Sequence, residues 1–146
     1  MSDRPPISAI EDDIIEEFSL FDNWEDKYEY IIDMGKKLPT LENEYKKDEN
    51  RIRGCQSTVW MVSEARDGRI YYKADSDAVI VKGLISMLIR VLSGQKAEDI
   101  VKADMHFIDK IGMSTHLAQT RSNGLRAMIK QMKMDAMAWK SISIKS

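Results

Sequence analysis

The sequence predicts an α+β domain in which a small antiparallel sheet of about three strands packs against helices. Helical periodicity occupies the first forty residues and returns after Asp75, while the segment between them has strand character. Asp67-Gly68 separates two runs rich in β-branched and aromatic residues, 59–65 and 70–74, which is the pattern of a β-hairpin. The order of helices, hairpin and helices favours an α+β fold over an alternating α/β fold.

Two helices are predicted before the hairpin. The first covers residues 7–18, where Ser8 and Glu11 have the spacing of a capping box. The second is capped at Asn23 or its neighbour, and its apolar face ends before Pro39. Both patterns are typical of amphipathic helices whose apolar faces pack into a core.

A third helix is predicted over residues 78–92, directly after the hairpin. Lys82, Ser86 and Arg90 recur at intervals of four and make one narrow polar stripe on an otherwise apolar segment. This helix is therefore expected to be largely buried. The preceding acidic and hydroxyl residues, Asp77 among them, are expected to cap it.

The remaining elements are shorter or lie near the C-terminus. Short helices are predicted at 97–102 and 104–110, and a last helix from residue 122 or 123 to about 139. Arg51 and Ile52 are expected to add a short edge strand, which would be the third strand of the sheet. The core of the sheet is expected to hold the residues Val59, Trp60, Val62, Ile70 and Tyr72.

Length and composition indicate one cytoplasmic domain. The 146 residues fit a single domain, 1–146, with flexible ends at 1–6 and 141–146. The N-terminus lacks the pattern of a secretory signal, no apolar run is long enough to cross a membrane, and one cysteine suits a reducing compartment. We therefore expect no membrane partner.

Charge is distributed unevenly along the chain. Residues 1–50 hold 15 acidic and 6 basic residues, whereas residues 51–146 hold 9 and 16. A mixed surface on one domain explains this, and a dipolar surface that orients a charged partner is the alternative. No dense basic run interleaved with aromatic residues is present, so no nucleic-acid partner is expected.

Metal and phosphate sites find no support in the sequence. His106 and His116 are ten residues apart and accompany a single cysteine, which does not match the paired ligand spacing of a zinc site or the several thiolates of an iron–sulfur cluster. Neither type of glycine-rich phosphate loop is present. We expect no metal and interpret both histidines as ordinary helix or loop residues.

Cys55 is the residue with distinctive chemistry, because it is the only cysteine in the chain. An isolated cysteine is most often an inert packing residue, and that alternative stays open here. Gly54 before it permits a tight turn, and Gln56 and Ser57 after it are polar, which favours a loop position. Without a second cysteine the thiol forms no internal disulfide, which suits a carrier that accepts a group on sulfur and passes it on.

Two arginines lie close to this cysteine in sequence. Arg51 and Arg53 would share a face with Cys55 on an extended chain and would lower the pKa of its thiol, although a solvated strand edge explains them equally well. A thiol hydrolase using His106 or His116 as a base is a third possibility, but no motif marks either histidine as a partner of the cysteine.

Four segments of the chain, in order, resemble the SufE family of sulfur-acceptor proteins. They are NWEDKYEYIIDMGKKLP (23–39), NRIRGCQSTVW (50–60), DSDAVIVKGLI (75–85) and STHLAQTRSNGL (114–125). The resemblance runs from about residue 21 to residue 132, which is most of the chain. It implies an α+β fold similar to that of the IscU-type scaffold proteins, although those assemble clusters on three cysteines and this chain has one.

The resemblance implies a sulfur carrier rather than an enzyme. Proteins of this family take persulfide sulfur from a PLP-dependent cysteine desulfurase (SufS-like), stimulate that enzyme, and pass sulfur to an iron–sulfur assembly scaffold (SufBCD-like) in the SUF system. Cys55 matches the acceptor cysteine. The PLP belongs to the desulfurase, so no cofactor is expected on this chain.

Further positions match the family around the acceptor cysteine. Gly54, Gln56 and Ser57 match its loop, and Trp60 matches the anchor of that loop. The family resemblance also implies that the thiol rests against an apolar surface, which disfavours the thiolate.

Asp77 and Arg121 match polar positions near the cysteine loop and the desulfurase interface. Arg53 departs from the family pattern, in which an uncharged residue is usual, and is expected to favour the thiolate or to meet an acidic partner surface. His116 matches a recurrent histidine to which no catalytic role is assigned.

The resemblance leaves alternatives open. A CsdE-like paralogue serving a different desulfurase or acceptor has the same motifs, and a non-covalent allosteric activator of the desulfurase would need no thiol. We expect a monomer or a weak homodimer.

Overall fold

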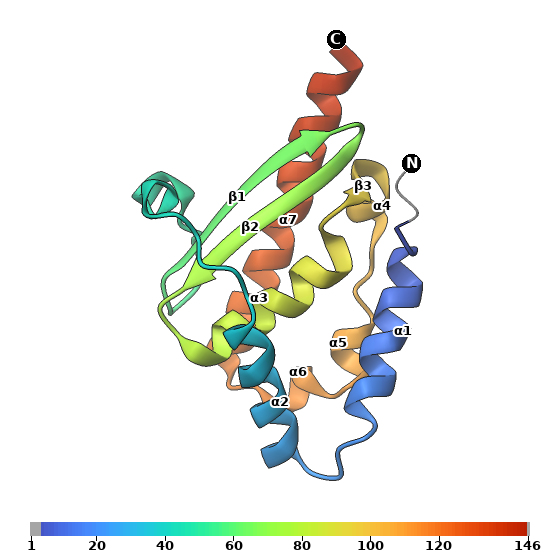
Figure 1. Cartoon of the computed structure of the whole chain (residues 1–146), viewed down its shortest axis with the longest axis vertical. Helices are drawn as coiled ribbons and strands as arrows, with labels where there is room; N and C mark the ends of the chain where they lie inside the picture. The colour runs from blue at the N-terminus through green and yellow to red at the C-terminus, as the bar shows by residue number, and fades with distance from the viewer. Residues whose placement is uncertain (1–3, 146) are drawn as a thin grey trace.

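Seven α-helices and a three-stranded antiparallel sheet make up residues 4–145, the part of the chain that the computed structural model describes (Figure 1). The predicted α+β class is confirmed. The elements are α1 (Ile7–Phe18), α2 (Trp24–Lys36), β1 (Val59–Arg66), β2 (Arg69–Ser76), α3 (Val79–Leu92), β3 (Gln95–Lys96), α4 (Ala97–Lys102), α5 (Phe107–Lys110), α6 (Met113–His116) and α7 (Gln119–Lys145). Two 3-10 turns, η1 (Asn43–Tyr45) and η2 (Asp48–Asn50), occupy the connection between α2 and β1.

The sheet is the predicted hairpin plus one strand that the sequence did not indicate. β1 and β2 pair in register from Val59 opposite Ser76 to the turn at Asp67 and Gly68, both of which have positive φ. The third strand is β3, which pairs with β2, whereas Arg51 makes only a single bridge to Trp60. The predicted edge strand at 51–52 is therefore reduced to one bridge.

One face of the hairpin packs against α7, which passes behind it (Figure 1). The Tyr72 hydroxyl donates to the carbonyl of Met132 at 2.6 Å, and the Trp139 indole N–H donates to the Ser63 hydroxyl at 3.1 Å. These bonds fix the rotation of α7 against the sheet.

Burial along β1 alternates as the pleat requires. Val59 is fully buried, as predicted, and so are Ile70 and Tyr72 on β2. Trp60 and Val62 are only half-buried, so their assignment to the core was wrong. They point to the opposite face of the strand, where Lys46 lies over the Trp60 ring.

α3 is the central helix, and the predicted polar stripe is the part of it that reaches the surface. Lys82, Ser86 and Arg90 are half-exposed, while most of its other residues are buried. The Arg90 guanidinium binds both carboxylate oxygens of Glu17, at 2.8 and 2.5 Å, and Tyr30 donates to the same carboxylate. This network joins α1, α2 and α3.

α2 crosses α3 at a contact between two glycines. A Cβ added to Gly83 would lie 2.1 Å from the carbonyl oxygen of Ile31, and one added to Gly35 would lie 2.6 Å from the backbone nitrogen of Gly83. Backbone atoms on both sides leave no flexible neighbour to move away. Glycine is therefore required at this crossing because the two helices approach more closely than a methyl group allows.

The helix starts differ from the sequence predictions in one case and agree in another. Asn23 caps α2, as expected, by accepting from the Asp26 amide at 2.9 Å. The capping box predicted for Ser8 and Glu11 was wrong, because Pro6 precedes α1 without a side-chain cap. The Glu11 carboxylate is buried instead and accepts from the Phe107 amide at 3.1 Å.

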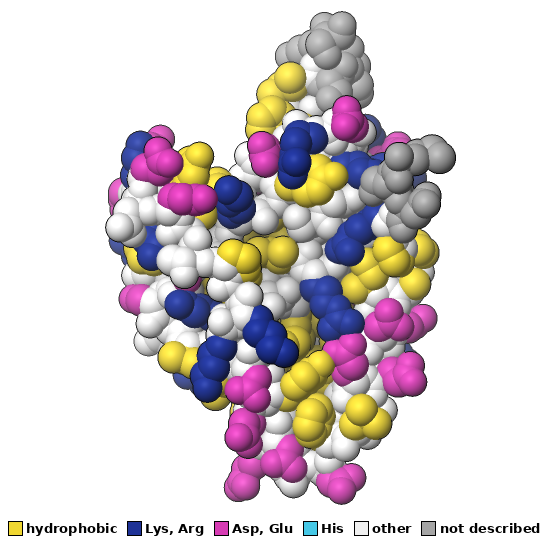
Figure 2. Space-filling view, in the orientation of Figure 1, with side chains coloured by type: hydrophobic (Ala, Val, Ile, Leu, Met, Phe, Trp, Pro, Cys, Tyr) yellow, Lys and Arg dark blue, Asp and Glu magenta, His cyan; other side chains and the backbone are white. Residues whose placement is uncertain are grey.

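The last helix is longer than predicted at both ends, because α7 runs from Gln119 to Lys145. No helix within residues 4–145 is long and apolar enough to span a membrane. The flexibility expected for 1–6 and 141–146 stays a prediction, and residues 1–3 and 146 lie outside the described part. Acidic side chains gather at the end of the molecule where α1 passes into α2 (Figure 2).

We predict that Gly83→Ala lowers the free energy of unfolding by about 2–3 kcal/mol, because the added methyl group overpacks the helix crossing. Chemical denaturation followed by circular dichroism measures the change. Val79→Ala in the first turn of the same helix is the control, because Val79 is 57 % exposed and its truncation leaves stability within about 0.5 kcal/mol. A Gly83→Ala protein as stable as the control would contradict the account.

Candidate functional site

Cys55 lies in a loop that is closed at its base. The Ile52 amide donates to the carbonyl of Val59 at 2.9 Å, and Arg51 bridges to Trp60 one residue further out. Residues 53–58 therefore leave and re-enter the sheet edge at one point. The loop that the sequence predicted around Cys55 is present, with a fixed base and no regular secondary structure between its ends.

Two glycines bring this loop against α7. Gly54 has φ +89°, a left-handed conformation that side chains disfavour, and a Cβ there would lie 3.3 Å from the Ala127 methyl carbon. Gly124 on α7 has no side chain to separate the helix from the thiol, and the Cys55 Sγ lies 3.6 Å from the Gly124 carbonyl oxygen. The thiol thus rests on the helix backbone.

A pocket of about 250 Å³ opens beside the half-buried thiol. Its floor is apolar and comes from three elements: Val59 of β1, Val81 and Leu84 of α3, and Met128 of α7. The thiol therefore has free space next to it rather than tight packing on all sides. This argues against the inert packing residue that composition alone favours.

The polar residues of the pocket include three that the sequence singled out. Gln56, Ser57 and Arg121 all line it together with Cys55. Arg121 is exposed near the start of α7 and forms no ion pair with any described residue. Its guanidinium is thus available to an anionic group that enters the pocket.

The surroundings of the thiol disfavour its thiolate form. Burial raises the pKa of Cys55 above its ordinary value, as the family resemblance implied. The expectation that Arg51 and Arg53 lower it was wrong, because both guanidinium groups bind the Asp48 carboxylate, at 3.6 and 3.1 Å. The two arginines instead pair with Asp48 at the surface, Arg51 at the base of the loop and Arg53 at its first residue.

Asp77 holds the loop base from the other side. Its carboxylate accepts from the Thr58 amide at 3.2 Å, and its own amide donates to the Thr58 carbonyl at 3.4 Å. The predicted helix cap was wrong, because Ala78 precedes α3 and receives no side-chain cap bond from Asp77. The Ser76 hydroxyl accepts from the Ala78 amide instead.

The sequence reasoning missed the helix walls of the pocket. Gly124 and Met128 are four residues apart on one face of α7, and Val81 and Leu84 are three apart on α3. Their periodicity predicts burial, but nothing in it indicates that they face the cysteine loop. The sequence gives no sign that Gly124 contacts Cys55, because Gly124 has ordinary helical geometry and no turn or cap requires a glycine there.

Among the residues that the structure describes, one group of side chains outside this pocket is close enough to hold a metal ion. Ligand atoms of Glu11, Asp104 and His106 lie within 4.8 Å of one another. They contact each other as they stand, since His106 Nδ1 lies 3.3 Å from both Glu11 Oε2 and Asp104 Oδ1. We interpret these three side chains as structural contacts between α1 and the segment that leads into α5. The imidazole ring of His116 stacks on the Trp24 ring, with the ring centroids 4.3 Å apart.

Comparison with known proteins identifies a family. Residues 12–136 match the family model SufE, described as an Fe-S metabolism associated domain. An uncharacterized SufE-like protein of Rhizobium meliloti is 39 % identical over 130 residues, covering 86 % of this chain and 93 % of its own length. A second, from Rhizobium etli, is also 39 % identical over 130 residues, covering 86 % of this chain and 88 % of its own.

A solved structure shares the fold. The solution structure of a hypothetical protein from Thermus thermophilus superposes with a TM-score of 0.73 at 17 % identity, and the match covers 88 % of this chain and 94 % of that one. At this identity the likeness supports the architecture alone.

We predict that alkylation of Cys55 has a pH midpoint above that of the same thiol in the denatured chain, because burial disfavours the thiolate. Rates with iodoacetamide across pH 7–10 measure the midpoint, and the single cysteine makes the signal unambiguous. Arg53→Gln leaves the midpoint unchanged, because Arg53 binds Asp48. A rise of about 0.5 pH unit or more in that variant would show that the arginine acts on the thiol.

We predict that Asp77→Ala speeds alkylation of Cys55 and lowers the free energy of unfolding by about 1 kcal/mol, because the Thr58 amide loses its acceptor. Asp77→Asn is the matched control, since its side-chain oxygen still accepts that bond. Equal alkylation rates in the Ala and Asn variants would mean that Asp77 does not restrain the loop.

Proposed function

Because this chain belongs to the SufE family, whose model describes an Fe-S metabolism associated domain, we propose that Cys55 accepts sulfur from the persulfide of a PLP-dependent cysteine desulfurase. The observation that supports this most directly is a lone thiol on a loop closed at its base, beside an open pocket. A cysteine that only fills space in a core does not require a pocket beside it, whereas the added sulfur atom of a persulfide does.

The proposed transfer is an exchange at sulfur with no net redox change. The Cys55 thiolate attacks the terminal sulfur of the desulfurase persulfide, a new S–S bond forms, and the old one breaks. The desulfurase cysteine leaves as a thiolate, and the product on this chain is Cys55–SSH. A second exchange of the same kind unloads the sulfur: an acceptor thiolate attacks the terminal sulfur of Cys55–SSH, and Cys55 leaves as a thiolate.

The burial of the thiol determines what the desulfurase must supply for transfer. Burial raises the pKa of Cys55, so the attacking thiolate is scarce until the loop is exposed or a positive charge approaches. We propose that the loop opens about its base, which the Ile52–Val59 and Asp77–Thr58 bonds hold, whereas the thiol has packing contacts with the core and a 3.6 Å hydrogen bond to the Gly124 carbonyl. Docking of the desulfurase supplies the opening, with Arg121 at the mouth.

The proposed role is that of a stoichiometric carrier in the cytoplasm rather than a catalyst. The PLP stays on the SufS-like desulfurase, and the recipient of the sulfur is a SufBCD-like scaffold. A single cysteine favours carriage, because a neighbouring thiol would expel the sulfur by forming a disulfide. A monomer or weak homodimer suffices, and a CsdE-like paralogue with another desulfurase would use the same chemistry.

The test is to incubate the chain with a PLP-dependent cysteine desulfurase and L-cysteine and to measure its intact mass. We expect a gain of one sulfur atom that maps to Cys55, that a reductant removes, and that Cys55→Ser abolishes. Sulfur accepted equally by Cys55→Ser would overturn the assignment.

The allosteric alternative has its own discriminating experiment. Desulfurase turnover is measured with Cys55→Ala in excess reductant, since this variant keeps the docking surface and lacks the acceptor. We expect its stimulation to fall at least about tenfold below that of the unmodified chain. Full stimulation would assign the chain a non-covalent activating role instead.

A further inference from the structure

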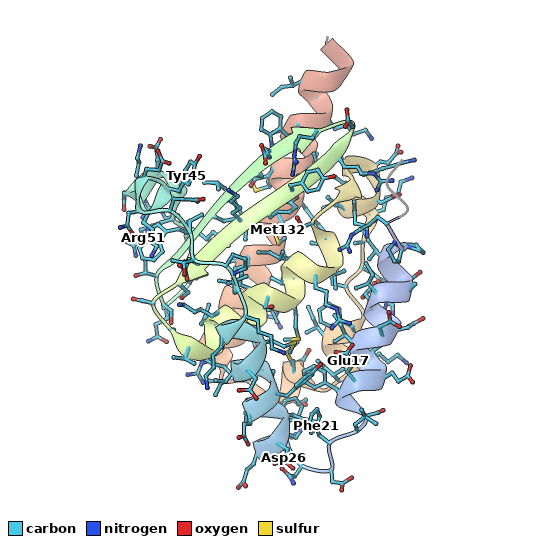
Figure 3. The ribbon with its side chains drawn as sticks, viewed as in Figure 1. Glu17, Phe21, Asp26, Tyr45, Arg51 and Met132 are labelled. Carbon is cyan, nitrogen blue, oxygen red and sulfur yellow. The ribbon has the colours of Figure 1, made fainter. Side chains whose placement is uncertain are left out.

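A second pocket, of about 290 Å³, lies beside the base of the cysteine loop. Its walls are the segment 49–52, β1 and α7, and they include Arg51 and Ile52, the two residues that pair with β1 to close the loop. Figure 3 shows Arg51 on this segment, next to Tyr45 and outside the edge of the hairpin. Nothing in the proposed sulfur transfer uses this pocket.

Asp135 gives this pocket an unusual charge. It is the only acidic residue of α7, a helix that carries six Lys and Arg residues. None of the described basic side chains forms an ion pair with it. Its carboxylate is half-buried and is bonded by neutral groups, the Gln131 amide at 2.8 Å and the Ser63 hydroxyl.

Two basic residues have partners of their own: Arg51, which lines the pocket, and Lys133, two residues before Asp135 on α7. The Arg51 guanidinium binds Asp48, and the ammonium group of Lys133 donates to the Ala103 carbonyl. On the facing wall Glu49 adds a second carboxylate, exposed and only loosely paired with Lys47 at 3.9 Å. The pocket is thus lined by two carboxylates and one guanidinium, that of Arg51, which is paired with Asp48 at 3.6 Å.

A half-buried carboxylate without a countercharge is an unfavourable arrangement that a bound cation would relieve. Burial raises the pKa of Asp135, which reflects this cost, and the hydrogen bonds from Gln131 and Ser63 offset it only in part. A guanidinium or ammonium group placed against the carboxylate would stabilise its charged form.

We propose that the pocket between segment 49–52, β1 and α7 binds an organic cation, a guanidinium or primary ammonium group, through Asp135 and Glu49. The volume suits the end of one side chain. The position favours an Arg or Lys side chain of a protein docked at the cysteine loop, because Arg51 and Ile52 belong to both the pocket and the loop base. An occupant there would contact the strand from which the loop departs.

The test is a titration of the isotope-labelled chain with N-acetyl-arginine amide, followed by NMR. We expect saturable shifts at Ser63, Gln131 and Ile52, and no such shifts with N-acetyl-citrulline amide, the neutral isostere. Asp135→Asn raises the dissociation constant at least about fivefold, and Asp67→Asn at the exposed hairpin turn, which removes one charge elsewhere, leaves it unchanged.

Glu49→Gln provides a second variant on an exposed wall, where folding is not at risk, and is expected to raise the dissociation constant about twofold. Equal binding of the arginine and citrulline compounds, or binding unaltered in both Asp135→Asn and Glu49→Gln, would overturn the proposal.

A binding measurement with the desulfurase distinguishes the two possible sources of the cation. This measurement rests on the proposed function. If a partner side chain occupies the pocket, Asp135→Asn weakens desulfurase binding at least about fivefold. If the ligand is a small free amine, desulfurase affinity is unchanged while the arginine compound still loses binding. Sulfur loading of Cys55 is scored separately by mass, so failure of the cation site leaves the proposed function standing.

Discussion

The crossing of α2 and α3 at Gly35 and Gly83 is the contact on which the rest of the structure depends. α3 lies between α1 and α2 on one side and the sheet on the other, so its distance from α2 sets the thickness of the core. Val81 and Leu84, on either side of Gly83, form the floor of the pocket at Cys55. The helix that Gly83 holds against α2 thus also supplies two residues of the wall beside the thiol.

The site combines a rigid frame with a weakly held reactive group. Backbone bonds and the Asp77 carboxylate hold the base of the loop, whereas the thiol is held by packing against the core and by one long hydrogen bond to α7. Under the proposed function this division protects a persulfide from solvent while it rests and leaves the loop free to move when a partner docks. The raised pKa of Cys55 follows from the same burial, and under the proposed function the partner supplies what favours the thiolate.

The sequence predicted the elements whose signals are local. The hairpin turn at Asp67-Gly68 and the cap at Asn23 are fixed by neighbouring residues, and the structure confirms both. Tertiary contacts overrode local signals elsewhere: Glu11 left its capping position to bind the Phe107 amide, and Asp77 bonded Thr58 rather than capping α3. The pairing of Arg53 with Asp48 was likewise invisible, because both are surface residues of a loop with no periodicity.

The central claim is direct transfer of sulfur to Cys55, and a single-turnover experiment tests it most directly. The desulfurase is charged with one equivalent of radiolabelled persulfide sulfur, freed of L-cysteine, and mixed with excess chain in the presence of a sulfide scavenger. The account predicts that label leaves the desulfurase and arrives at Cys55 in equal amounts and at one rate. Label that stays on the desulfurase, or that is recovered only in the scavenger, would contradict it.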